Sequence, residues 1–161
     1  MTKILLILHV LAAVIAVGPV TVAGSMFPAA ARKAAGAPDA TEAVAAVRLL
    51  HRICRVYAVV GLAVPVFGFA TAGSLHVLGT AWLIVSIVLT GVAALVLALL
   101  VLPAQENVLA GLAGTGSGVA AAARPEPARI KRLAMLTGVF NLLWATVTVL
   151  MIVRPGSTTG V

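Results

Sequence analysis

Four long apolar segments constrain the fold of this chain more than any other feature. They cover residues 4–26, 56–72, 77–102 and 133–153. A helix of about 17–25 residues crosses the hydrocarbon core of a bilayer, so each segment is long enough to do so. Because lipid offers no partner to backbone polar groups, a spanning segment must bond its own N–H and C=O groups. We therefore predict one all-α membrane domain, a bundle of four transmembrane helices.

Composition agrees with a membrane protein. Hydrophobic residues make up 62% of the chain and charged residues 9%, whereas about 25% of the residues of a soluble domain are charged. A single core of 161 residues could not bury so much apolar surface. The formal net charge is +7, but the basic residues flank the apolar segments, which favours lipid headgroups over nucleic acid as their partners. The expected location is the bacterial cytoplasmic membrane.

The basic residues also predict the orientation. Nine of them lie in or beside the first and third loops, and two lie on the other side. Loops rich in Lys and Arg stay in the cytoplasm, so both termini are predicted to be extracytoplasmic. The nine are Arg32, Lys33, Arg48, Arg52, Arg55, Arg124, Arg129, Lys131 and Arg132, and the two are Lys3 and Arg154.

The two basic loops differ in character. Asp39-Ala-Thr-Glu42 resembles a capping box, which predicts a helix that leads directly into the second segment. On that helix Arg48, Arg52 and Arg55 share one face, which either serves only to set the topology or also binds anionic lipid. Residues 105–129 are rich in Gly and contain Pro, which is typical of a flexible cytoplasmic linker.

Few residues offer chemistry. No Asp, Glu or Lys lies deep in a segment, which argues against an ion pump and against catalysis by carboxylates. His9 is the one ionisable side chain within a segment. It is either a ligand to haem b or copper, or a structural donor to a carbonyl of a neighbouring helix. His76 and Met151 are expected at a similar depth and complete a candidate cofactor set, although the leading expectation is that no cofactor is bound.

Polar side chains form two stripes at helical spacing. Ser86 and Thr90 lie on the third segment, and Thr137, Asn141 and Thr148 lie on the fourth. Such stripes turn away from lipid and pair across helices. We expect all five side chains in the interior of the bundle, where they either hold the helices together or line a polar pocket.

Three stretches of sequence resemble a known family. They are Leu8-His9-Val10-Leu11 with Gly18-Pro19, Arg48-Leu-Leu-His51-Arg52 leading into Gly61 and Gly68, and Asn141-Leu-Leu-Trp144 running to Arg154-Pro155. The chain resembles an uncharacterised family of bacterial integral membrane proteins, domain-of-unknown-function family 2269. That family is distantly similar to the copper-resistance D proteins and to the haem-binding membrane protoporphyrinogen oxidases.

The resemblance implies a role toward haem for His9, which matches the first-helix histidine of the oxidases. The oxidases also have a functional lysine in their third span, and residues 77–102 contain none, so oxidase activity is not implied. We expect a non-catalytic structural or accessory component of a membrane assembly, as a homo-oligomer or within a larger complex. The alternative is a redox protein that binds haem b or copper through His9.

Overall fold

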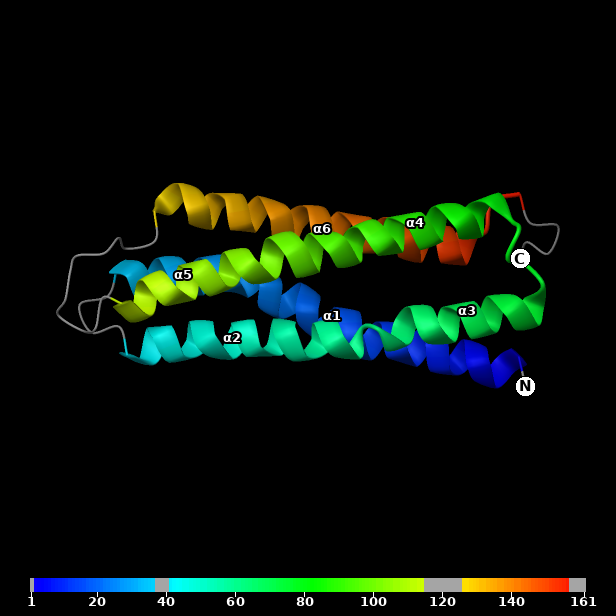
Figure 1. Ribbon diagram of the computed structural model, residues 1–161, viewed down its shortest axis with the longest axis horizontal. Coiled ribbons are helices and arrows are strands. Elements are labelled where there is room, and N and C mark those ends of the chain that lie inside the picture. Colours follow the sequence, from blue (N-terminus) through cyan, green and yellow to red (C-terminus); the bar gives the residue numbers. More distant parts are fainter. Residues whose placement is uncertain (1, 37–40, 115–125, 157–161) are drawn as a thin grey trace.

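The computed structural model describes residues 2–36, 41–114 and 126–156. These residues form helices and no strand (Figure 1). Four rods, each long and apolar enough to cross a membrane, lie side by side in antiparallel order. The predicted all-α bundle of four spans is thus confirmed, while its orientation stays a prediction. The elements are α1 (Thr2–Gly36), α2 (Thr41–Val60), α3 (Ala63–Leu75), α4 (Ala81–Leu95), the π-helix η1 (Val96–Val101), α5 (Leu102–Gly114) and α6 (Pro127–Val153).

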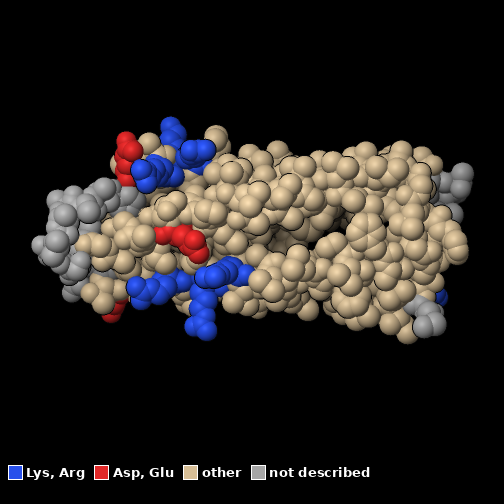
Figure 2. Space-filling model, in the orientation of Figure 1, with Lys and Arg blue, Asp and Glu red and all other residues tan. Residues whose placement is uncertain are grey.

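The two ends of the bundle differ in charge. The start of α1 and the end of α6 lie together at one end, which we call the terminal end (Figure 1). The end of α1, the start of α2, the end of α5 and the start of α6 lie at the opposite end, which we call the basic end. Lys, Arg, Asp and Glu gather near the basic end on the face shown in Figure 2. The middle of that face shows no charged side chain, as is expected of a surface in contact with hydrocarbon.

The third rod is longer than predicted and corrects part of the linker. Residues 105–114 belong to α5 and are helical, because Gln105, Val108 and Leu112 share one face and bury it in the bundle. At the other side of the predicted linker, Pro127 begins α6, where the missing N–H of proline has no cost. Residues 115–125 lie outside the described residues.

The second rod is broken near its middle. The first part, α2, begins at Thr41 with Glu42 in its first turn, while Asp39 of the predicted capping box lies outside the described residues. The rod is interrupted at Gly61 and Leu62, before α3. Pro65 has no N–H to donate to the Gly61 carbonyl, which instead accepts from the Val64 N–H at 3.1 Å.

A proline also accounts for the π-helix. The η1 turn lies directly before Pro103. In a regular α-helix the ring of Pro103 would clash with the carbonyl of Leu99 and leave it without a donor. The wider π turn moves this carbonyl aside, so the rod passes from α4 into α5 without a loop.

Helix α1 changes neighbours along its length. Toward the basic end it lies against both α2 and α6. A β-carbon added at Gly24 would be 3.2 Å from the Thr137 methyl group and 4.0 Å from the Cys54 Sγ atom. Near the terminal end it lies against α3, where His9 bonds to Val64. The α4 helix packs on α6 instead. Figure 2 shows an opening between the α1–α3 pair and the α4–α6 pair.

Candidate functional site

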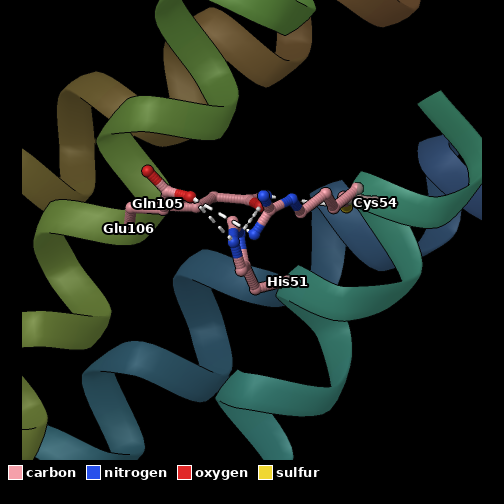
Figure 3. A network of polar contacts seen from close by, with 5 residues as sticks. His51, Cys54, Gln105 and Glu106 are labelled. Carbon is pink, nitrogen blue, oxygen red and sulfur yellow. Dashed lines mark hydrogen bonds and ion pairs between the residues drawn. The ribbon is translucent and has the colours of Figure 1, made fainter. Parts of the chain in front are cut away.

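The most extensive polar network joins α2 to α5 (Figure 3). We call it the α2–α5 cluster; it consists of His51, Cys54, Arg55, Gln105 and Glu106. The Gln105 side chain is 0% exposed and lies between His51 and Cys54. Its Nε2 group donates to the Cys54 Sγ at 3.6 Å, so its Oε1 atom accepts from the His51 Nδ1–H at 3.0 Å. One buried amide therefore connects two side chains of the facing helix.

The edge of the α2–α5 cluster reaches the surface. The Glu106 Oε1 atom lies 3.6 Å from the His51 Nε2 and 3.9 Å from the Arg55 Nη1. The Glu106 and Arg55 side chains are largely exposed, and exposed ion pairs contribute at most about 1 kcal/mol. The buried bonds of Gln105, rather than this ion pair, hold α5 against α2.

The geometry of the α2–α5 cluster favours a structural clamp over catalysis. A nucleophilic thiol needs a base within hydrogen-bond reach, and the partner of Cys54 is an amide, which is not a base. In the described part of the chain no three His, Cys, Asp or Glu side chains are grouped to hold a metal ion. The cluster therefore fixes the position of two helices relative to each other.

Sequence reasoning missed Gln105 because it assigned residues 105–129 to a linker. It also assigned no role to His51, whose side chain the structure buries between α2 and α5. The spacing of two residues on the second rod could have indicated this site. His51 and Cys54 are three residues apart and therefore share the helix face that carries the fully buried Val47. A polar residue on such a face requires a buried partner from another helix.

His9 bonds to the backbone of the neighbouring helix. Its Nδ1 atom lies 2.9 Å from the carbonyl oxygen of Val64, and because a carbonyl can only accept, Nδ1 carries the proton. The ring also packs on Gly68, where an added β-carbon would be 3.0 Å from its Cε1 atom. This is the carbonyl contact that the structural alternative predicts, and it leaves the Nε2 lone pair free.

The other two members of the candidate cofactor set lie elsewhere. His76 is exposed and ends α3 in the left-handed conformation, with φ of 56°. Since Gly68 contacts His9, His76 is eight residues, or about 12 Å of helix, beyond that contact. Met151 packs on Ala72, Trp82 and Leu83. No contact found in the described residues joins His9, His76 and Met151.

The polar stripe of the third segment turns inward at Ser86 but does not pair with another helix. Ser86 is fully buried and donates to the Trp82 carbonyl at 2.8 Å. Thr90 is half-buried and donates to the Ser86 carbonyl at 2.7 Å. Both hydroxyl groups therefore bond to their own helix, and neither provides a bond between helices.

The stripe of the fourth segment is only partly inside. Thr137 is buried, and Asn141 is half-buried with its Nδ2 group donating to the Ser25 Oγ at 3.0 Å. The prediction for Thr148 is wrong, because this side chain is exposed and bonds to the Trp144 carbonyl. The physical reason is that α1 covers this face of α6 only near the basic end and then diverges toward α3.

The three arginines of the second rod form an exposed face. Arg48, Arg52 and Arg55 are exposed on α2, whereas Val47, His51 and Cys54 on the other face are buried. We call the three the basic face. Its binding of anionic lipid stays a prediction.

The comparisons with known proteins give one positive finding. A family model described as "Predicted integral membrane protein (DUF2269)" matches residues 3–155. No curated protein and no solved structure matches the chain. The resemblance to family 2269 is thus confirmed, while the more distant one to the copper-resistance D proteins and the oxidases stays a prediction.

Proposed function

This chain belongs to the DUF2269 family of predicted integral membrane proteins, and on that premise we propose that it is a non-catalytic structural or accessory component of a membrane assembly. The assembly lies in the bacterial cytoplasmic membrane. It consists of copies of this chain or of this chain with other membrane proteins, in contact with anionic lipid.

One observation carries the proposal, namely that His9 and five hydroxyl side chains along the rods bond to backbone carbonyls of the protein itself. The His9 ring donates to the Val64 carbonyl. Five hydroxyl groups donate to the carbonyl four residues earlier, those of Thr71, Ser86, Thr90, Thr146 and Thr148. Groups that are satisfied in this way stabilise helices and present nothing to a substrate.

The outer surface supports the same proposal. Along α6 the side chains of Met135, Leu142 and Ile152 are 63%, 69% and 73% exposed. Helices associate in membranes by packing such surfaces closely. The protein therefore has an apolar exterior that suits lipid or the helices of a partner.

Photocrosslinking in cells tests this proposal. A photoreactive side chain is placed singly at Leu142 on α6, Val14 on α1 and Ile84 on α4, which are all exposed. We expect one of the three positions to give a protein adduct of a single size, with twice the chain mass for a homo-oligomer. Adducts with lipid alone at all three positions would overturn the proposal.

The second candidate function is redox chemistry at His9, and one observation favours it. The Nδ1–H bond to the Val64 carbonyl fixes the tautomer and directs a free Nε2 lone pair away from it, as in many metal-binding histidines. Copper fits poorly, because no three His, Cys, Asp or Glu side chains are grouped among the described residues to hold it. Haem b fits better, because haem iron accepts one axial histidine and supplies the electron-transfer chemistry itself.

Absorption spectra and two variants separate the two functions. His9→Gln keeps a donor for Val64 but is a poor ligand, and His9→Leu removes both. Loss of a Soret band in His9→Gln with unchanged thermal stability would support haem binding. A colourless wild type, with only His9→Leu destabilised, would support the structural role, which is the result we expect.

A further inference from the structure

A groove of about 190 Å³ lies between α1 and α6 in the half of the bundle near the basic end. Small residues create it, since Gly138 has no side chain and faces open space. The groove lies apart from the α2–α5 cluster and from the basic face. Its walls include Ser25, Pro28 and Arg32 of α1, and Thr137, Gly138 and Asn141 of α6.

The walls of the groove hold two polar atoms without a partner. The Thr137 side chain is 3% exposed, and its hydroxyl has no hydrogen bond among the described residues. The Asn141 Oδ1 atom is also buried without a partner there, although its Nδ2 group bonds to Ser25. A buried polar group without a bond costs about 1–3 kcal/mol, so a ligand that supplies the bond would be favoured.

The amide of Asn141 can serve a ligand in either orientation. The Ser25 hydroxyl both donates and accepts, so turning the amide by 180° keeps the bond between the two residues. The turned amide would place its two N–H donors at the buried position that Oδ1 now occupies, beside the groove. Together with the Thr137 hydroxyl, this wall then offers donors to an oxygen-rich ligand.

The mouth of the groove toward the basic end is positively charged. Arg32 is exposed there, one helical turn of about 5.4 Å beyond Pro28. The ion pairs found among the described residues involve Glu106, and Arg32 takes part in neither. The groove therefore combines a cation at the bundle end with polar side chains about two helical turns deeper, since Thr137 and Asn141 lie against Gly24 and Ser25.

From this arrangement we infer that the groove binds one anionic phospholipid of the leaflet at the basic end. The phosphate pairs with Arg32, the Thr137 and Asn141 donors bond to the ester oxygens, and an acyl chain runs past Gly138. A cation at the bundle end and polar side chains deeper in the groove match the phosphate and the ester groups of a phospholipid. This inference rests on the proposed function only in that the chain is embedded in lipid.

Native mass spectrometry of the full chain in mild detergent tests the inference, with phosphatidylglycerol as the probe and phosphatidylcholine as the neutral comparison. We expect one phosphatidylglycerol to bind in preference to phosphatidylcholine. Gly138→Leu fills the groove, and should weaken this binding at least tenfold, as an order-of-magnitude expectation for steric exclusion. Arg32→Gln should weaken it about fivefold, the effect of one charge near an anionic surface.

Two control variants test whether a loss of phosphatidylglycerol binding is specific to the groove. Gly91→Leu places the same side chain at an exposed glycine of α4 that also faces open space, and Lys3→Gln removes an exposed charge from the opposite, terminal end. Both should leave this binding within about twofold of the wild type, an effect below 0.5 kcal/mol. Equal loss in Gly138→Leu and Gly91→Leu, or in Arg32→Gln and Lys3→Gln, would overturn the site.

A third probe distinguishes binding of a whole lipid from binding of a soluble phosphate ester. Glycerol 3-phosphate carries the phosphate without acyl chains and should not bind at the concentrations that saturate phosphatidylglycerol. Comparable binding of both would show a site for soluble phosphate esters and overturn the lipid assignment. Failure of this test leaves the crosslinks of Leu142, Val14 and Ile84 unchanged, so it is distinguishable from failure of the proposed function.

Discussion

Buried hydrogen bonds between single side chains decide how these helices meet. The Gln105 amide, His51 ring and Cys54 thiol are all buried and satisfy one another. A buried polar group is costly when its partner is removed, more than the bond itself is worth. The same reasoning applies to the His9 ring, whose Nδ1–H has the Val64 carbonyl as its acceptor.

The first prediction concerns Gln105. Gln105→Leu leaves the His51 Nδ1–H buried without an acceptor and should lower the free energy of unfolding by about 1–3 kcal/mol. His51→Leu should act similarly, and the double variant should lose less than the sum of the two losses. Unfolding in mixed micelles with increasing sodium dodecyl sulfate measures all three.

The control for these three variants is Glu106→Gln. It changes only an exposed ion pair and should lower the free energy of unfolding by less than about 1 kcal/mol. If the losses in the free energy of unfolding of Gln105→Leu and His51→Leu simply added up in the double variant, the two side chains would not depend on each other, which would contradict their role in holding α5 against α2.

The second prediction concerns Gly68. In Gly68→Ala the new β-carbon would be 3.0 Å from the His9 Cε1 atom, so the ring must move. This overpacking should cost about 1–3 kcal/mol in the same unfolding measurement. Gly73→Ala is the control on the same helix, since nothing lies within 4 Å of its new carbon. Equal stability of the two variants would show that the ring of His9 is not held in place.

Prolines shape the elements without dividing the bundle. Pro65 lies in the first turn of α3, just after the break from α2, and Pro103 lies in the first turn of α5, just after the π-helix. In each case the missing N–H changes the local hydrogen bonding and the rod continues on the other side. An apolar segment with a proline therefore remains one span, as the sequence predicts, although its helix is not regular.

The third prediction concerns the basic face of α2. Replacing Arg48, Arg52 and Arg55 together by Gln should reduce the amount of phosphatidylglycerol and cardiolipin that purifies with the protein, since each charge contributes about 1 kcal/mol near an anionic surface. Phosphate analysis of lipid extracts measures the loss.

The control for the basic face is substitution of the exposed Ala45 and Ala46 by Gln, which adds polar bulk without removing charge. Val47 is unsuitable because it is 0% exposed and belongs to the core. Unchanged lipid in the triple variant would leave the basic face with a topological role alone.

For the whole molecule, the segregation of charge predicts its orientation. Most of the charged side chains visible on one face gather near the basic end (Figure 2). The positive-inside rule places the basic end in the cytoplasm.

The fourth prediction tests this orientation. His76→Cys, exposed beyond α3, should react with an impermeant thiol reagent added to intact cells, whereas Arg52→Cys should react only after the cells are opened. The native Cys54 thiol is 0% exposed, so it can remain in both variants without adding a signal. Labelling of Arg52→Cys in intact cells would reverse the assigned orientation.

The sequence by itself determined the four helices, their apolar segments and the charge at the basic end. It could do so because hydrocarbon acts on each segment separately, through length, hydropathy and flanking charge. Only the tertiary structure decided which face of a helix meets which neighbour. The burial of Gln105, the bond of His9 to Val64 and the exposure of Thr148 all depend on the course of another helix. Helix pairing in lipid follows from the fit of small residues and polar partners across the bundle, and no single segment contains that information.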